Sequence, residues 1–266
     1  MALPSAPRCV VTGAAGGFGR SLALELAGRR AHLVLGDIDV AGCEETKGLW
    51  LAAGAASARA VRCDVTKVEE VEARAEACDG PIDLVVNNTG VSSAGRIGDQ
   101  PLGDWRWTLE VDLFGGVLHG CHLFVPRLRA QGHGHVLNVA SAAGLLCAPK
   151  MGACDVAKAG VVALSETLAG ELAETRVGVT ALCPMFLRTT LAASGRFADE
   201  SLRAAAERLV AGGKDARGVA RAALSAVDAS AFYSVPMADG RWLWRLKRLA
   251  PSVFRRLLAL GAKRRE

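Results

Sequence analysis

The sequence predicts a single α/β domain in which a doubly wound parallel sheet lies between two layers of helices, a three-layer αβα arrangement. The chain has 266 residues, of which 51% are hydrophobic, so it is long enough to bury one large core. Short apolar runs alternate with longer segments of helical periodicity along most of its length. Runs that are apolar at consecutive positions are typical of parallel strands covered on both faces.

The expected strands are short apolar runs, at residues 8–12, 31–37, 58–64, 82–88, 135–141, 177–183 and 231–236. The expected helices, with apolar residues on one face, are residues 17–30, 41–54, 66–78, 101–130 (one long helix or two joined ones), 153–173 and 215–229. Right-handed crossovers between parallel strands place a ligand crevice at the carboxyl ends of the strands. Residues 184–214 are expected to be irregular and to lie over this crevice as a lid.

Charge and cysteine usage exclude several classes of protein. The net charge is +5, but residues 241–266 hold nine Lys/Arg and one Glu, a local +8 that leaves −3 for the remainder. A nucleic-acid face on the main domain is therefore not predicted. No apolar run is long enough to span a membrane or to serve as a secretory signal, which favours a cytoplasmic protein.

Two residue types that often bind metals are also explained without a metal. The eight cysteines form no CxxC pair and mostly lie in apolar runs, so we interpret them as small buried residues in a reducing compartment. His133 and His135 flank glycines and have no suitably spaced acidic or cysteine partner, and we expect them in a surface loop. No metal site is predicted.

A glycine-rich turn joins the first strand to the first helix, in TGAAGGFGR at residues 12–20. Its glycines allow a tight turn and a close approach to a pyrophosphate at the helix N-terminus, so the expected binding residues are Gly13, Gly17, Phe18 and Gly19. Asp37 ends the second strand, where an acid can bind ribose hydroxyls and repel a 2′-phosphate. The turn therefore predicts a dinucleotide, with NAD favoured over NADP. Alternatively, Asp37 or Asp39 caps the next helix.

At this point the chain resembles the short-chain dehydrogenase/reductase family, over about residues 8–238. The matching motifs occur in family order: TGAAGGFG at 12–19, Asp37, CDV at 63–65, NNTG at 87–90, Ser141, Lys158 and the segment from Cys183 to Thr189. The resemblance implies a Rossmann-type NAD(P)-binding domain, residues 1–238. Asp64 and Val65 would border the adenine, and Asn88 and Gly90 would lie near the ribose. Thr189 would bind the carboxamide, with Pro184 and Leu187 also at the cofactor.

The resemblance also implies a catalytic set of Ser, Tyr, Lys and Asn that moves a proton as hydride passes between nicotinamide and a carbonyl or alcohol carbon. Ser141 and Lys158 match this set. Cys154 stands at the tyrosine position, and Asp112 stands at the asparagine position. The single tyrosine, Tyr233, is expected to pack on the last strand rather than to substitute.

Four interpretations of Cys154 remain open. In the first, Lys158 lowers the pKa of the Cys154 thiol. In the second, the short side chain leaves a gap, and a water in this gap relays a proton from Lys158. Otherwise Cys154 is a nucleophile toward an aldehyde, or a small side chain at a position without catalytic demand. Asp112 pairs with Lys158 or binds a water, and its charge would stabilise the oxidised, cationic nicotinamide.

Residues 239–266 form a basic amphipathic tail. Trp242, Leu246, Leu249, Val253 and Leu257 follow helical spacing between arginines and lysines, and Pro251 divides the segment. Such a tail is typical of peripheral contact with a membrane through residues 241–266. The alternatives are packing on the protein's own crevice or on a second subunit.

Three functions fit these observations. The first is an NAD(P)-dependent oxidoreductase acting on an apolar alcohol, ketone or aldehyde, with impaired or unusual proton transfer. The second is a catalytically silent NAD-binding relative that acts as a regulator or partner subunit. The third is a membrane-peripheral protein with a vestigial dinucleotide site. The resemblance further suggests a homo-oligomer formed through residues 104–130 and 153–173.

Overall fold

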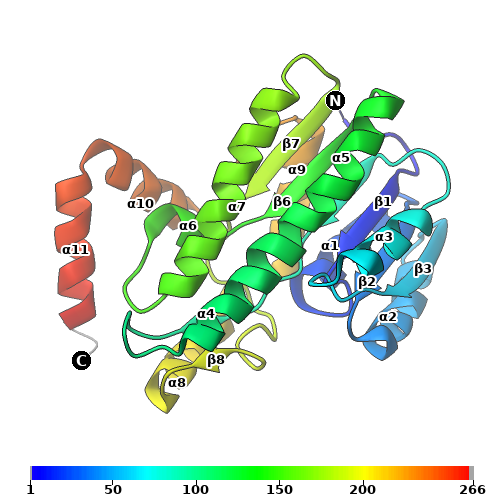
Figure 1. Ribbon diagram of the computed structural model, residues 1–266. Helices are drawn as coiled ribbons and strands as arrows, with labels where there is room; N and C mark the ends of the chain where they lie inside the picture. The colour runs from blue at the N-terminus through cyan, green and yellow to red at the C-terminus, as the bar shows by residue number, and fades with distance from the viewer. Residues whose placement is uncertain (1, 264–266) are drawn as a thin grey trace.

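The computed structural model describes residues 2–263 and contains the predicted parallel sheet (Figure 1). Seven strands pair in the order β3-β2-β1-β4-β6-β7-β9, and every pair is parallel. Their bounds are β1 Arg8–Thr12, β2 His32–Asp37, β3 Ser57–Arg62, β4 Leu84–Asn87, β6 Gly134–Val139, β7 Val177–Leu182 and β9 Tyr233–Ser234. The strand order reverses direction between β1 and β4, which makes the carboxyl ends of these two strands the ligand crevice of such a sheet.

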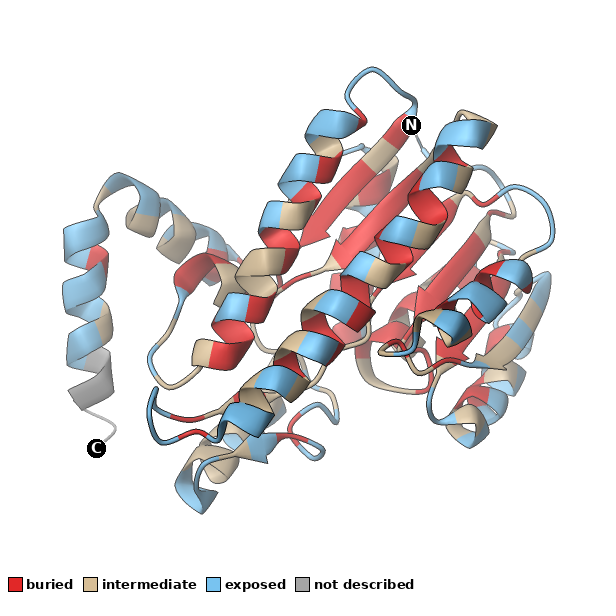
Figure 2. Ribbon diagram, in the orientation of Figure 1, coloured by how far each residue is buried: buried red, intermediate tan, exposed pale blue. Residues whose placement is uncertain are grey.

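Helices cover both faces of the sheet, as predicted, and each face has its own apolar core (Figure 2). One core forms where α1 (Gly17–Ala27), α2 (Val40–Ala52) and α9 (Ala216–Asp228) pack on the sheet. The other forms beneath α3 (Val68–Glu76), α5 (Gly120–Gln131) and α7 (Gly152–Glu171). The sheet is buried on both sides because its strands are apolar at consecutive positions, which is the pattern that predicted a parallel sheet.

The segment expected as one long helix or two joined ones is a continuous helix with a π-helical middle. It runs through α4 (Leu102–Leu109), η1 (Glu110–His119) and α5. Glycines let the helix lie close to the sheet: a Cβ at Gly120 would stand 2.1 Å from Oδ1 of Asn87. The wider π turns occur frequently at functional sites, and Asp112 lies within this segment.

Residues 184–214 are more regular than the sequence predicted. They contain strand β8 (Arg196–Phe197), which pairs with β5 (Ser93–Ala94), and helix α8 (Glu200–Ala211). Helix α8 has no buried residue, so it packs into neither core. The segment still lies at the end of the molecule where the strands end, below α4 and α7 in Figure 1, in the position expected of a lid.

The tail is a pair of helices, α10 (Ala238–Leu249) and α11 (Pro251–Lys263), divided before Pro251 as predicted. The five apolar residues do not share one face, because the chain bends at Ala250 between the helices. Leu246 is half-buried, whereas Trp242, Leu249, Val253 and Leu257 are exposed. Helix α10 packs near α6 (Ala142–Leu146), where Nζ of Lys247 donates to the carbonyl of Leu145 at 2.7 Å. Residues 264–266 of the predicted tail lie outside the described residues.

His135 contradicts its predicted position in a surface loop. It lies buried in β6, and its Nε2 is 2.8 Å from Oγ1 of Thr180. The two glycines that precede it, Gly132 and Gly134, suggested a loop, but His135 also begins the expected strand 135–141, and Gly178 on the neighbouring strand leaves room for the ring. Six of the eight cysteines are buried as predicted, while Cys78 is half-buried and Cys147 is exposed; all eight are free thiols.

Candidate active site

The glycine-rich turn after β1 has the backbone that its sequence predicted. Gly13 and Gly17 have φ values of 63° and 53°, in the left-handed region where a side chain is strained. A Cβ at Gly19 would stand 2.0 Å from the carbonyl oxygen of Gly13. Helix α1 begins at Gly17, so its free N–H groups face the turn, which is the arrangement that holds a pyrophosphate. The side chain of Phe18 packs in the core, which leaves only its backbone for a ligand.

The two acids after β2 have separate roles. Asp39 is the N-cap of α2, where its Oδ1 accepts the N–H of Gly42 at 2.8 Å. Asp37 ends β2, and its Oδ2 accepts the N–H of Ala15 in the glycine-rich turn at 2.9 Å. The capping alternative therefore applies to Asp39. Asp37 holds the turn and places a carboxylate at its edge.

The other predicted cofactor residues meet at the same crevice. Asn88 follows β4, and its Nδ2 donates to the carbonyl of Thr12 at 2.8 Å, which ties β4 to the glycine-rich turn. Asp64 follows β3; its hydrogen bonds from Thr66 hold the pKa of the Asp64 carboxyl below its usual value. Val65 is buried beside Asp64.

The segment after β7 reaches across to the glycine-rich turn. The carbonyl of Pro184 accepts the N–H of Ala142 at 2.8 Å, and Leu187 forms a short parallel bridge with Lys214. A Cβ at Gly17 would stand 3.5 Å from Cβ of Thr189. Thr189 therefore lies beside the turn that would hold the phosphates, and the segment closes one side of the crevice.

Lys158 and Asp112 form a buried ion pair, one of the two alternatives that the sequence left open. Nζ of Lys158 lies 3.3 Å from Oδ2 of Asp112, which is fully buried. The same Nζ donates to the carbonyl of Val139 at 3.3 Å, and Oδ1 of Asp112 accepts the N–H of Val91 at 2.6 Å. A Cβ at Gly90 would stand 3.2 Å from Nζ, so the ion pair lies directly beneath Gly90 at the crevice.

Burial has the largest effect on the protonation of the Asp112 carboxyl. Burial raises the pKa of the Asp112 carboxyl, and the ammonium of Lys158 and the N–H of Val91 lower it only in part. Such a pair is costly to assemble, and removal of either partner would leave an uncompensated polar group. The carboxylate nevertheless balances the charge of Lys158 beneath Gly90, so the pair leaves little net charge at the crevice.

Cys154 contradicts the expectation that Lys158 lowers the pKa of its thiol. Burial raises this pKa, and the carboxylate of Asp112 raises it further, whereas Lys158 has only a minor opposing effect. The thiol is also bound elsewhere: Sγ lies 3.3 Å from both the N–H and the carbonyl of Ser93. Cys154 is therefore a neutral, hydrogen-bonded side chain whose Sγ is turned toward β5, and a thiolate nucleophile is disfavoured.

Ser93 and Thr108 are site residues that sequence reasoning missed. Both are buried, and their hydroxyl oxygens lie 2.8 Å apart, so they form a polar floor beneath Cys154. No motif marks either residue, because the contact joins segments that are distant in sequence. The only available signal was the polar run at 91–100 beside the expected crevice.

Ser141 and Tyr233 lie where the sequence placed them. Ser141 follows β6 and caps α6, accepting the N–H of Ala143 with its hydroxyl oxygen at 3.1 Å. Tyr233 lies on β9, packs against Trp244 with ring centroids 4.7 Å apart, and donates a hydrogen bond to Glu166. This bond and burial raise the pKa of Tyr233 well above its usual value, so it is a packing residue.

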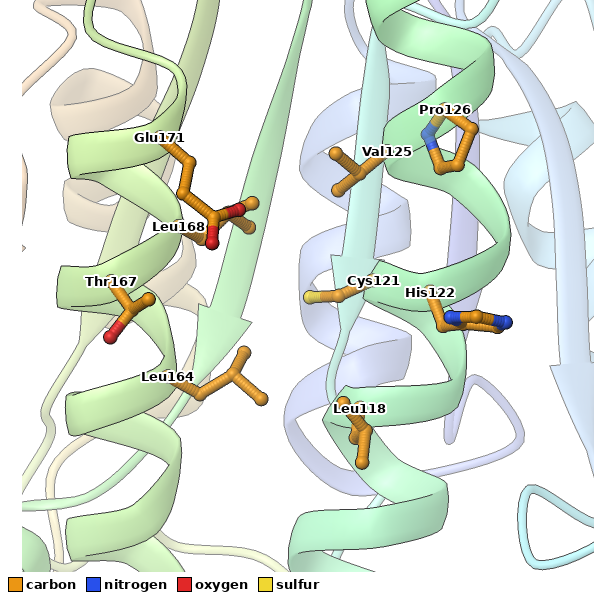
Figure 3. A pocket seen from close by; sticks show the side chains of 9 residues that line it. All are labelled: Leu118, Cys121, His122, Val125, Pro126, Leu164, Thr167, Leu168 and Glu171. Atoms are coloured by element: carbon orange, nitrogen blue, oxygen red, sulfur yellow. The ribbon is translucent and has the colours of Figure 1, made fainter.

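A separate cavity lies away from this crevice. It is a groove of about 450 Å³ between the helix that contains η1 and α5 and the helix α7 (Figure 3). Leu118, Val125 and Leu164 are among the apolar side chains that line it, and Glu171 closes one end. None of the predicted site residues lines this groove. Among the described residues, no group of His, Cys, Asp and Glu could hold a metal ion, and no helix is long and apolar enough to cross a membrane.

Comparison with known proteins defines the class. The model of the short chain dehydrogenase family matches residues 8–200, so the chain belongs to this family. The fold and the crevice at the strand ends agree with that assignment. Among curated proteins, the chain is 36% identical over 195 residues to the putative oxidoreductase SadH of Mycobacterium tuberculosis, covering 71% of this chain and 70% of SadH.

Solved structures extend the likeness beyond residue 200. A short chain dehydrogenase/reductase from Burkholderia phymatum, solved in complex with NAD, is 34% identical with a TM-score of 0.87. The match covers 93% of this chain and 95% of that one. A short-chain dehydrogenase from Sphingobium yanoikuyae in complex with NADPH has a TM-score of 0.78, covers 89% of this chain and 91% of that one and, at 23% identity, shows the fold alone.

Proposed function

We propose that this short-chain dehydrogenase is an NAD-dependent oxidoreductase that acts on an alcohol or carbonyl group of an apolar substrate. When bound, the nicotinamide would supply or accept the hydride. The observation that carries the proposal is the buried Lys158–Asp112 pair beneath Gly90, at the carboxyl ends of the central strands. Burial of a charged pair costs free energy, and a dinucleotide bound above the pair would give these charges a function.

The glycine-rich turn and Asp37 support NAD as the cofactor. The turn leaves no room for a Cβ at Gly19, which fits the close packing of helix on strand in a dinucleotide-binding turn. The carboxylate of Asp37 stands at the edge of this turn, where it would accept hydrogen bonds from ribose hydroxyls. A 2′-phosphate at the same position would be repelled by that charge, so NADP should bind more weakly.

We infer that Cys154 stands where the family has its catalytic tyrosine, and Asp112 where it has an asparagine. The bound thiol of Cys154 is then not the proton donor. Lys158 is then the cationic donor nearest to the position of Cys154. Its ammonium would protonate the substrate oxygen directly, or through a water that fills the place of the missing tyrosine ring. General acid catalysis contributes about 10²- to 10⁴-fold, so slow turnover is expected.

A second candidate is a catalytically silent NAD-binding relative that regulates a partner. The observation that favours it is the hydrogen bonding of the Cys154 thiol to Ser93, which removes the position from proton transfer. Both candidates require NAD to bind at the same crevice, and turnover alone separates them.

The setting proposed for this function is the cytoplasm, with the chain acting as a homo-oligomer. Free cysteines throughout support a reducing compartment. The groove in Figure 3, which Leu118 and other apolar side chains line, forms an apolar surface between two long helices, and such a surface suits self-association. A molar mass by light scattering that corresponds to one chain would contradict the oligomer.

NADH turnover against a panel of apolar aldehydes and ketones tests the main proposal. The native chain is compared with the double variant Cys154→Tyr/Asp112→Asn, and NADH binding is measured for both by fluorescence. Slow turnover by the native chain supports the lysine-based oxidoreductase. Turnover by the double variant alone supports the silent relative. Absence of NADH binding by the native chain overturns both candidates.

A further inference from the structure

Both tail helices, α10 and α11, expose apolar side chains that the fold does not bury. Figure 1 shows α11 at one edge of the molecule, beyond α6, and Figure 2 shows that most of it is exposed. The exposed fractions are 59% for Trp242, 85% for Leu249, 48% for Val253, 47% for Leu257 and 60% for Leu260. A set of exposed apolar residues of this size marks an interaction surface.

This exposed face differs from the face that holds the tail in place. Phe254 is 2% exposed, and it packs in the core cluster with Leu258 from the same helix. Val253, Leu257 and Leu260 lie four and then three residues apart, so they form a second apolar stripe along α11. The stripe is not needed to dock the helix, because Phe254 and Leu258 already do so.

The charge around the stripe indicates its partner. From residue 240 to residue 263 the chain contains seven Lys/Arg and no Asp or Glu. Arg245, Arg255 and Arg256 are exposed, and none of them has an ion-pair partner among the described residues. Two such tails would repel one another, whereas an anionic surface would attract them.

We propose that the α10–α11 tail binds the surface of a bilayer that contains anionic lipids. The stripe of Val253, Leu257 and Leu260 inserts at the level of the headgroups, and Leu249 and Trp242 extend the contact. Arg256 lies beside the stripe and binds lipid phosphates, whereas Arg255, on the opposite side of α11, adds to the positive charge of the helix. The combination of an exposed apolar stripe and unpaired arginines is the recognised form of a helix that lies in the interface.

The attachment of α10 to α6 places the exposed surface of the tail beside the candidate active site. Lys247 binds the carbonyl of Leu145 at the end of α6, and Ser141 caps the beginning of the same short helix. The bilayer would therefore lie next to the substrate side of the crevice. This inference goes beyond the proposed oxidoreductase activity and does not depend on turnover.

Co-sedimentation of the full chain with vesicles tests the inference, using phosphatidylcholine with and without phosphatidylglycerol. We expect binding only to the vesicles that contain phosphatidylglycerol. Leu257→Glu should weaken binding about tenfold or more, and Arg255→Gln/Arg256→Gln should weaken it about fivefold or more, with most of the loss from Arg256. Leu51→Glu, at an equally exposed leucine on α2, and Arg255→Lys/Arg256→Lys are the matched controls and should bind as the native chain does.

The outcomes are distinct from those of the activity assay. NADH binding and thermal unfolding of each variant establish that the crevice and the fold are intact. Equal binding to both kinds of vesicle, no binding to either, or equal losses for Leu257→Glu and Leu51→Glu would overturn the inference. It is also overturned if Leu257→Glu leaves vesicle binding unchanged but lowers the molar mass, because a second copy would then cover the stripe.

Discussion

The Lys158–Asp112 pair shows how one residue can change the character of an active site. Asp112 is fully buried, and its carboxylate lies 3.3 Å from Nζ of Lys158. The charge of Lys158 is therefore largely balanced by Asp112, and little of it remains to lower the pKa of Cys154. The raised pKa of the thiol follows from burial and from the same carboxylate.

Asp112→Asn should shift the preference of the site from NAD⁺ toward NADH. The carboxylate lies beneath the crevice and attracts the cationic, oxidised nicotinamide, an effect that an amide lacks. We expect the affinity for NAD⁺ to fall about 3- to 30-fold relative to that for NADH, measured by calorimetry. Asp104→Asn, at a half-buried carboxylate of α4 that pairs with Arg196, is the control. An unchanged affinity ratio would remove the electrostatic role of Asp112.

The cysteines should differ sharply in reactivity. Cys147 is exposed, whereas Cys154 is buried, hydrogen-bonded to Ser93 and has a raised pKa. Iodoacetamide at pH 8 should therefore modify Cys147 first, and Cys154 about 100-fold or more slowly. Mass spectrometry of the modified peptides measures both rates, with Cys147→Ser as the control. Early labelling of Cys154 would restore the thiolate interpretation.

At the scale of elements, the site depends on close approaches between segments. The glycine-rich turn, β4 and the π-helical segment η1 meet around Gly13 and Gly90. A Cβ at Gly13 would stand 2.8 Å from Nδ2 of Asn88 and 3.1 Å from Cα of Thr89, and a Cβ at Gly90 would stand 3.2 Å from Nζ of Lys158. A larger residue at either position would therefore displace a neighbouring group. The irregular helix around Asp112 belongs to the same crowded region.

Gly19→Ala should abolish tight binding of NADH, while Gly16→Ala should not. A Cβ at Gly19 would stand 2.0 Å from the carbonyl oxygen of Gly13, whereas a Cβ at Gly16 would have no atom within 4 Å. We expect about a tenfold or greater loss of affinity, with a loss of stability of about 1–3 kcal/mol from the displaced turn. Fluorescence titration and thermal unfolding measure the two effects. Equal affinities for the two variants would contradict the placement of the cofactor.

At the scale of the whole molecule, the tail is coupled to the body through buried polar groups. Asp155 lies next to Cys154 on α7, and its Oδ1 has no hydrogen-bond partner among the described residues. Burial raises the pKa of Asp155 from 3.8 to about 7, and Lys247 of the tail opposes this rise only in part. The stability of the packed tail should therefore depend on pH.

The native chain should lose stability through Asp155 as the pH rises from about 4 to about 7. The folded state holds this proton more tightly than the unfolded state, so raising the pH favours unfolding until the folded carboxyl has ionised. Asp155→Asn should remove this contribution. The gain in free energy of unfolding of the variant over the native chain should therefore be about 1–4 kcal/mol larger at pH 8 than at pH 4. Urea unfolding of both proteins at the two pH values measures it. A constant difference between them would refute the raised pKa.

The sequence by itself determined the layered α/β fold and most of the crevice. Alternating apolar strands and amphipathic helices fix a parallel sheet, and the motifs at strand ends place Gly13, Asp37, Asn88 and Lys158 at one edge. These predictions succeed because they depend on short-range patterns: side-chain periodicity, turn chemistry and the position of a residue within its own element.

Only the tertiary structure decided which groups neutralise one another. The contact of Cys154 with Ser93, the burial of His135 in β6 and the docking of Phe254 all join segments that are distant along the chain. The same is true of the raised pKa values of Cys154 and Asp155, since desolvation depends on what the fold packs around a group rather than on its neighbours in sequence. Local patterns therefore located the site, and long-range packing set its charge and its chemistry.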